Sequence, residues 1–132
     1  VPFDLIAQIG YGTLQDDESL FNEIHQAEWE QKVAINSHFI LHKTNQKLEY
    51  VALENEAYDV IYFDAFAPKK QPELWNETLF TKLFNATKPG GVLSTYSAAG
   101  QLKRDLKAAG YSIENPPGAN GKREMTVALK PI

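Results

Sequence analysis

The stretch Tyr58-Asp59-Val60-Ile61-Tyr62-Phe63-Asp64-Ala65-Phe66-Ala67-Pro68 decides the fold of this chain. From Val60 to Phe63 the residues are β-branched or aromatic and apolar at every position, with no polar alternation. Such a run is typical of a central parallel strand that helices cover on both faces. Asp64 is the first carboxylate after the run, and Pro68 stops it. We therefore expect a strand buried on both sides that carries Asp64 to the edge of a sheet.

The residues after Pro68 alternate between helical and strand patterns. Asn76 can cap a helix with an apolar stripe at Leu79, Phe80, Leu83 and Phe84, and Pro89-Gly90-Gly91 is expected to end that helix. The elements expected next are a buried strand at 92–96, a helix at 99–109 that Gly110 ends, and strands at 111–114 and 125–129. This alternation predicts an α/β fold with a parallel sheet and right-handed crossovers. The last two strands, joined by a loop alone, can be antiparallel.

The residues before Tyr58 give weaker signals. Asp16-Asp17-Glu18-Ser19 precedes an amphipathic pattern that predicts a helix over about 17–30. Strand character over 33–43 and 48–53, with turn residues at 44–46 between them, predicts a pair of strands or one strand with a bend. Gly10-Tyr11-Gly12-Thr13 looks like a cofactor glycine loop, but no buried strand precedes it and a third glycine is missing, so we expect a turn.

Composition excludes several classes of protein. The chain has 132 residues, enough for one domain, and no cysteine, so disulfides and thiolate zinc sites are excluded. No apolar run approaches the roughly 20 residues that cross a bilayer, the three histidines form no metal-site pattern, and a cytoplasmic location is expected. Only three of the 13 basic residues precede residue 60, whereas 11 of the 17 acidic ones do. The positive second half permits a polyanionic partner without requiring one.

Three segments are expected at the rim where ligands bind in open α/β sheets: residues 64–68, residues 97–100 and the loop that ends at Glu124. Asp64 could carry chemistry there, or it could cap the next turn or the backbone of Ala67. In the last loop, Lys122 and Arg123 could hold phosphate, because an arginine can grip it in a bidentate manner. The alternative is a solvated hairpin in which Glu124 pairs with Arg123 or Lys122.

Four motifs together resemble one family: the stretch 58–68, Gln71-Pro72-Glu73-Leu74-Trp75, Pro89-Gly90-Gly91 and Gly121-Lys122-Arg123-Glu124-Met125. The family is the methyltransferase domain of the bacterial enzymes that make 5-methylaminomethyl-(2-thio)uridine in tRNA, often called MnmC-like. The resemblance covers essentially the whole chain and is strongest from Tyr58 to Met125. It implies a Rossmann-like class I methyltransferase sheet, mostly parallel with a reversed last strand. It also implies methyl transfer from S-adenosyl-L-methionine to the aminomethyl nitrogen of the modified wobble uridine.

The resemblance also implies roles for individual residues. Asp64 would face the target nitrogen as the catalytic residue, with Ala65, Phe66 and Pro68 shaping the substrate pocket. Asp64 and Ala65 would also touch the cofactor. Lys122, Arg123 and Glu124 would lie on the substrate side, against the anticodon region of tRNA. In some bacteria the domain is fused to an FAD-dependent oxidase, so such a domain or protein is a further expected partner.

The chain departs from the family at its beginning. The glycine-rich cofactor loop and the acid that normally binds the ribose are expected upstream of Val1, so the domain is expected to lack its first strand or strands. The position that often supplies an acid near adenine falls in Thr44-Asn45-Gln46-Lys47, which has none. A missing first strand would favour self-association. Two alternatives to the enzyme remain at this point: a cofactor-free interaction module on the same sheet, and a nucleotide-dependent oxidoreductase domain.

The expected position of the cofactor loop leads to a first prediction. The isolated chain of residues 1–132 should bind S-adenosyl-L-methionine weakly or not at all, and by itself should be inactive. Isothermal titration calorimetry measures this directly. A micromolar dissociation constant for the isolated chain would contradict the prediction.

Overall fold

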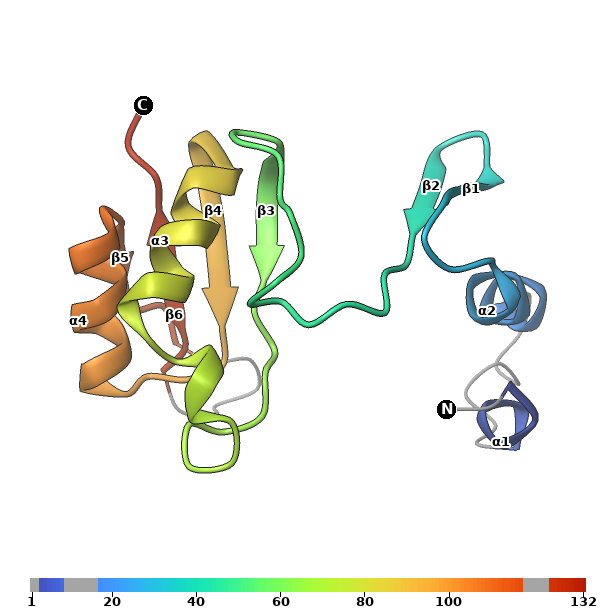
Figure 1. Ribbon diagram of the computed structural model, residues 1–132, viewed down its shortest axis with the longest axis horizontal. Coiled ribbons are helices and arrows are strands. Elements are labelled where there is room, and N and C mark those ends of the chain that lie inside the picture. The colour runs from blue at the N-terminus through green and yellow to red at the C-terminus, as the bar shows by residue number, and fades with distance from the viewer. Residues whose placement is uncertain (1–2, 9–16, 118–123) are drawn as a thin grey trace. The chain divides into compact units, whose positions relative to one another are not determined.

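The computed structural model describes residues 3–8, 17–117 and 124–132, and the chain divides into two compact units, Val1–Lys47 and Leu48–Ile132. Figure 1 shows both units, which are treated separately below. The expected turn at 10–13 and the cations Lys122 and Arg123 lie outside the described residues.

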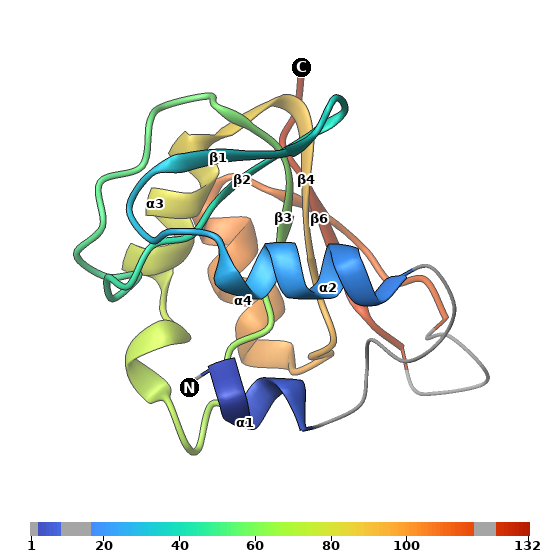
Figure 2. The same ribbon diagram turned by 90° about the vertical axis from the view of Figure 1, so that its right-hand side faces the viewer.

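Residues 3–8 and 17–47 of the first unit form two helices and a hairpin. They are α1 (Phe3–Ala7), α2 (Asp17–Gln26), β1 (Lys32–Asn36) and β2 (Phe39–His42), and β1 pairs with β2 in antiparallel fashion (Figure 2). The predicted helix over 17–30 is therefore too long. The Lys43 ammonium donates to the carbonyls of Ile24 and His25, both at 3.0 Å. A lysine thus satisfies carbonyls that the last turn of the helix leaves free.

The prediction of strands over 33–43 and 48–53 is wrong about where the strands begin and end. The turn lies at Ser37-His38, inside the first predicted strand, where the His38 amide donates to Asn36 Oδ1 at 2.9 Å. An asparagine that bonds the backbone two residues on favours a turn over a continued strand. Residues 48–53 form no strand. The Lys82 ammonium bonds the carbonyls of Leu48 and Glu49 at 2.7 and 3.1 Å, in place of a strand partner.

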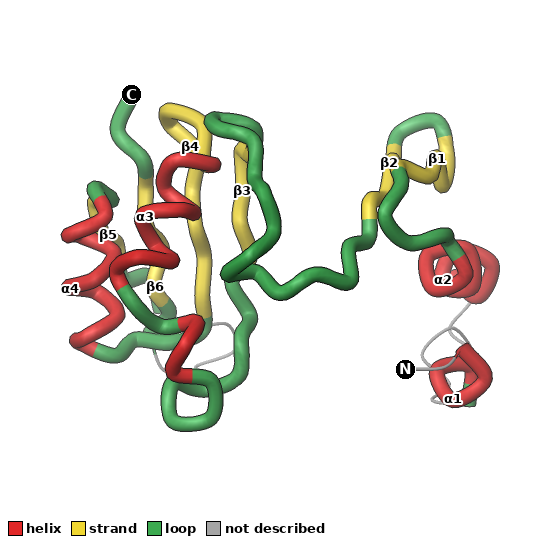
Figure 3. Tube along the Cα trace, viewed as in Figure 1, coloured by secondary structure: helices red, strands yellow, loops and turns green. Residues whose placement is uncertain are grey.

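The second unit holds a four-stranded sheet in the order β3-β4-β6-β5 (Figure 3). Its strands are β3 (Tyr58–Tyr62), β4 (Thr87–Thr95), β5 (Ser112–Glu114) and β6 (Thr126–Leu129). β3 pairs with β4 in parallel, whereas β6 is antiparallel to both β4 and β5. Three strands thus run one way and the last strand is reversed, which confirms the expected sheet.

Helices α3 (Glu77–Ala86) and α4 (Gly100–Ala109) lie side by side on one face of this sheet (Figure 1). Asn76 caps α3 as predicted, its side chain accepting from the Leu79 amide at 2.9 Å. Gly110 ends α4 in a left-handed conformation with φ of 115°, and an added Cβ would meet the Phe84 ring at 2.8 Å. The core between helices and sheet is apolar; its fully enclosed members are Phe80, Leu93, Leu106 and Ala128.

The opposite face of β3 is open in the second unit, so the prediction that this strand is buried on both sides is wrong. Val60 is 45% exposed and Tyr62 83% exposed, while Phe63 is buried in the core. The helices α3 and α4 cover only one face, and an apolar sequence alone does not tell whether the other is covered. β3 also lies at an edge of its sheet. Self-association of the isolated chain stays a prediction.

The Pro89-Gly90-Gly91 segment does not end the preceding helix, contrary to the prediction. Helix α3 ends at Ala86, and the three residues lie within β4. Glycine is required at position 91, because a Cβ there would come within 2.9 Å of the carbonyl oxygens of Asp59 and Lys88. The segment therefore permits close approach of β3 to the start of β4.

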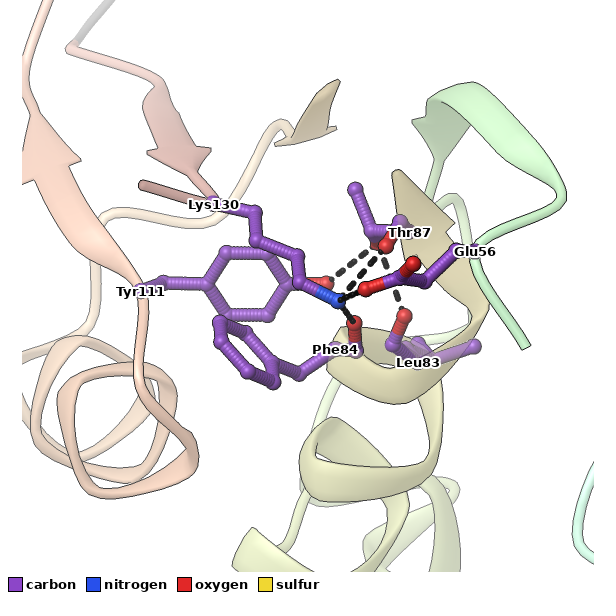
Figure 4. A network of polar contacts seen from close by, with 6 residues as sticks. All are labelled: Glu56, Leu83, Phe84, Thr87, Tyr111 and Lys130. Atoms are coloured by element: carbon purple, nitrogen blue, oxygen red, sulfur yellow. Dashed lines mark hydrogen bonds and ion pairs between the residues drawn. The ribbon is translucent and has the colours of Figure 1, made fainter. Parts of the chain in front are cut away.

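A buried polar network joins α3, β4 and the residues that flank the last strands (Figure 4). The Lys130 ammonium donates to the carbonyls of Phe84 and Thr87 at 3.1 and 2.8 Å, and pairs with Glu56 at 3.4 Å. The Thr87 hydroxyl donates to the Leu83 carbonyl and shares a 2.8 Å hydrogen bond with the Tyr111 hydroxyl. Cationic and hydroxyl donors thus satisfy the carbonyls at the end of α3.

This network leads to a prediction about pH. Tyr111 is only 3% exposed, and burial raises the pKa of its hydroxyl above the usual 10.0. Tyr111→Phe should lower the free energy of unfolding by about 1 kcal/mol at pH 7 through loss of the hydrogen bond. Above about pH 10 the unfolded tyrosine ionises while the folded one stays protonated, so the advantage of the parent chain should shrink. Urea unfolding at pH 7 and at about pH 10.5 measures both effects; a constant difference would contradict the pKa assignment.

Candidate functional site

Asp64 comes directly after the buried Phe63, just beyond the end of β3. The Phe63 amide continues the pairing with β4 by donating to the Ser94 carbonyl at 2.8 Å. The Phe63 ring is 5% exposed and packs edge-on against Trp75 and Phe80, at 5.1 and 5.5 Å between ring centroids. The next side chain, Asp64, is exposed. The sheet therefore delivers a carboxylate to its surface at the carboxyl end of β3, as the sequence predicts.

The Asp64 carboxylate is not engaged by the described part of the chain. No hydrogen bond or ion pair joins it to another described residue, so it does not cap the backbone of Ala67. The Ala67 carbonyl instead accepts from the amides of Lys70 and Gln71, at 2.7 and 3.1 Å, and closes the turn. The amides of Asp64 and Ala65 likewise have no hydrogen-bond acceptor among the described residues. A carboxylate and two backbone donors are thus available at this position.

Residues 64–71, here called the Asp64 loop, are held by three side chains. The Tyr96 hydroxyl donates to the Ala65 carbonyl at 2.9 Å, and the Trp75 indole donates to the Phe66 carbonyl at 2.7 Å. The Phe66 amide donates to Gln71 Oε1 at 3.0 Å. The Phe66 ring itself is 73% exposed, so the loop presents an aromatic face to solvent. Pro68 is also exposed, whereas Ala65 is half-buried.

The described residues Ser97 and Glu124, which belong to the other two predicted rim segments, lie at the same end of the sheet. Thr95, the last residue of β4, pairs with Thr126, the first residue of the reversed β6. The Thr126 hydroxyl donates to the Ser97 carbonyl at 2.7 Å and ties the segment before α4 to β6. Glu124 precedes β6 and forms an exposed ion pair with Lys103 of α4 at 3.8 Å. The reversed strand therefore starts where β3 and β4 end.

Sequence reasoning missed the residues that hold the Asp64 loop. Gln71 and Trp75 belong to a motif of the resemblance but carried no role there, and Tyr96 was expected only as the end of a strand. A buried strand followed by a proline-containing loop and a tryptophan within twelve residues could have suggested that an aromatic side chain folds back on the loop. One partner in each hydrogen bond is a backbone group, either a carbonyl or the Phe66 amide, and such groups leave no signal in the sequence.

Glu30 of the first unit is a second carboxylate that the sequence did not single out. It accepts from the Asn45 amide at 2.5 Å and from the Thr44 hydroxyl at 2.8 Å, and Gln46 adds a longer bond. These hydrogen bonds, the Asn45 amide first, lower the pKa of Glu30 below its usual value of 4.5. The segment 44–47, which has no acid of its own, is thus organised around a carboxylate from residue 30.

A hollow of about 410 Å³ lies at the start of α3, and Asp64 is not among its lining residues, which are Glu49, Glu73, Asn76, Thr78, Leu79 and Lys82. Two of its polar side chains have structural roles, because Asn76 caps α3 and Lys82 bonds two carbonyls. No group of three or more potential metal ligands occurs among residues 3–8, 17–117 and 124–132. Within the same ranges, no helix is long and apolar enough to cross a membrane.

Comparison with known proteins identifies the class. The model of a family described as S-adenosyl-L-methionine-dependent methyltransferases matches residues 16–131, nearly the whole chain. The fold agrees, because the structure of MnmC2 from Aquifex aeolicus superposes with a TM-score of 0.66 over 90% of this chain and 41% of that one, at 21% identity. The chain belongs to the S-adenosyl-L-methionine-dependent methyltransferase family.

Two bacterial proteins show a more particular similarity. The tRNA 5-methylaminomethyl-2-thiouridine biosynthesis bifunctional protein MnmC of Actinobacillus pleuropneumoniae is 41% identical over 73 residues, which are 55% of this chain and 11% of that protein. The protein of the same name from Cupriavidus metallidurans is 44% identical over 70 residues, 53% of this chain and 10% of that one. The chain thus spans about a tenth of the length of these relatives. The family assignment favours a methyltransferase over the oxidoreductase and the cofactor-free module.

Proposed function

We propose that this chain is part of an enzyme that methylates the aminomethyl nitrogen of the modified wobble uridine in tRNA. The observation that carries the proposal is the exposed carboxylate of Asp64 beyond the carboxyl end of β3, which bonds no other residue in the described part of the chain. Ligands bind at that end of the strands in open α/β sheets. Similarity to two proteins named for the biosynthesis of 5-methylaminomethyl-2-thiouridine in tRNA supports this choice of substrate.

The residues at the Asp64 position fit an S-adenosyl-L-methionine-dependent reaction. The backbone amides of Asp64 and Ala65, which have no acceptor among the described residues, can donate to polar groups of the cofactor, and the Ala65 side chain is small. When bound, the cofactor supplies a methyl group on a positively charged sulfur, which is electrophilic enough to react with a neutral amine. The protein mainly has to bring that amine into line with the methyl group.

Asp64 is suited to that task. Its carboxylate can accept a hydrogen bond from an N–H of the substrate amine, which directs the nitrogen lone pair away from Asp64. The bound cofactor would supply the methyl group and would keep the electron pair of its carbon–sulfur bond, while Asp64 would hold the amine in position. The nitrogen then carries an additional positive charge, and it loses a proton to the carboxylate or to water. A carboxylate already in an ion pair would serve this role less well.

The expected substrate contacts surround Asp64. The exposed ring of Phe66 offers a face on which a nucleobase can stack. Pro68, in the same loop, would shape the pocket beside that ring. Lys122 and Arg123 would contact the anticodon backbone, and Glu124 would lie on the same side, next to its partner Lys103. An FAD-dependent oxidase, as a fused domain or a separate protein, would supply the amine.

Replacement of Asp64 tests the proposal. In the complete gene product that contains residues 1–132, Asp64→Asn should lower kcat for methyl transfer to tRNA that carries the aminomethyl group but not its methyl group by about 10²–10⁴-fold, because a positioned proton acceptor is lost while the shape is kept. Transfer of labelled methyl groups measures the rate. The matched control is Asp59→Asn at the opposite end of β3, where the carboxylate pairs with Lys88 at 2.7 Å. Equal rates for parent and Asp64→Asn would refute the role of Asp64.

Salt dependence tests the tRNA contacts. A protein that neutralises phosphates loses affinity as salt rises, because bound counterions are released. The double variant Lys122→Ala/Arg123→Ala should reduce the slope of log affinity against log salt by about two, roughly one for each cation. The control is Lys107→Ala, an exposed lysine in the last turn of α4. Filter binding between about 50 and 200 mM salt gives the slopes; an unchanged slope would remove both cations from the interface.

A further inference from the structure

The hydrogen bonds of the Asp64 loop fall immediately after the carboxylate residue. The carbonyl of Ala65, the next residue, accepts from Tyr96. The amide of Phe66 donates to Gln71, and the Phe66 carbonyl accepts from Trp75. On the other side of Asp64, the Phe63 amide is bonded to β4 and its ring is in the core. The backbone at Asp64 is therefore fixed both before and after the functional side chain.

The three side chains come from different parts of the fold. Gln71 closes the loop itself, Trp75 follows the short 3-10 helix η1 (Pro72–Leu74), and Tyr96 follows β4. Trp75 also packs edge-on against the buried Phe63 and against Tyr96, at 5.1 and 6.1 Å between centroids. The Trp75 indole thus contacts the core, the Phe66 carbonyl of the loop and the ring of Tyr96.

We infer that Gln71, Trp75 and Tyr96 are positioning residues, which act on methyl transfer by fixing the backbone that carries Asp64. This inference rests on the proposed role of Asp64. A positioned proton acceptor is effective only when it is held near the reacting nitrogen, and a displacement of about 1 Å can cost roughly a hundredfold in rate. An exposed loop that contains alanines and solvent-facing lysines has no core of its own to hold it. Side-chain bonds to its backbone supply that restraint.

The location of these bonds separates positioning from general stability. Tyr96 is half exposed and its hydroxyl bonds a surface loop, so its loss should affect unfolding little. Tyr111 offers a matched comparison, since its hydroxyl makes a hydrogen bond of nearly the same length, at 2.8 Å, but in the buried network at the start of β4. Tyr96→Phe removes a hydroxyl just beyond the end of β4, and Tyr111→Phe removes a hydroxyl that bonds Thr87 at its start.

The test uses the complete gene product. Tyr96→Phe should lower kcat by about ten- to a hundredfold with the KM values for S-adenosyl-L-methionine and tRNA within about twofold of the parent. Tyr111→Phe should lower stability but leave kcat unchanged. Hydrogen exchange of residues 64–71, followed by mass spectrometry without any ligand, should become faster in Tyr96→Phe and not in Tyr111→Phe.

Gln71 supplies a rescue pair. Gln71→Leu removes the acceptor of the Phe66 amide and should speed exchange of the loop and lower kcat, whereas Gln71→Glu keeps an acceptor of the same length and should restore slow exchange. In an Asp64→Asn background, Tyr96→Phe should cost little further rate, because a residue that acts through Asp64 has no effect once that carboxylate is gone.

The outcomes are distinct. If Asp64→Asn impairs transfer but Tyr96→Phe and Gln71→Leu leave kcat within about twofold of the parent, the inference is overturned and the proposed function stands. Additive losses in Tyr96→Phe/Asp64→Asn also overturn it, since Tyr96 would then act independently of Asp64. If Asp64→Asn transfers methyl groups at the parent rate, the proposed role of Asp64 fails, and the inference fails with it. If the parent enzyme transfers no methyl group to this tRNA, the proposed function itself fails.

Discussion

The parallel pairing of β3 with β4 is the interaction on which the site depends. It places the Phe63 amide against the Ser94 carbonyl, inserts the Phe63 ring between Trp75 and Phe80, and leaves the following carboxylate in solvent. The close approach of the strands at their other end requires glycine at position 91. The aspartate at this one position is therefore accessible to solvent although its neighbour is part of the core. The chemistry proposed for the chain depends on that abrupt change of environment.

Elements with a complete local signal were predictable. Asn76 and the apolar stripe that follows it predicted α3, and Gly110 predicted the end of α4. The loop between the last two strands was compatible with an antiparallel β6. Elements that depend on distant contacts were not. A lysine at position 43 satisfies carbonyls at the end of α2, and a lysine at 82 bonds the carbonyls of a segment that has strand-like composition. Such bonds join residues 18 to 34 positions apart and leave no periodic pattern.

The site shows the same division. Asp64 was found because a carboxylate after an uninterrupted apolar run is conspicuous, and Glu124 because the reversed strand begins at the same rim. The burial of Tyr62 was predicted wrongly: its side chain is 83% exposed, and the residue type alone does not tell whether an aromatic ring is covered. Gln71 and Tyr96 were missed for another reason: they bond main-chain atoms, which every residue possesses. Recognition of side chains that restrain a loop requires coordinates, whereas recognition of the group that the loop carries does not.

Trp75 gives the loop a built-in optical reporter. Its indole nitrogen is bonded to the Phe66 carbonyl and its ring faces Phe63 and Tyr96, so its emission should follow the local polarity and any change in that bond. The chain has only one other tryptophan, Trp29 in the first unit. A form in which phenylalanine replaces Trp29 would therefore fluoresce from a single indole at the candidate site, without a dye or an added label.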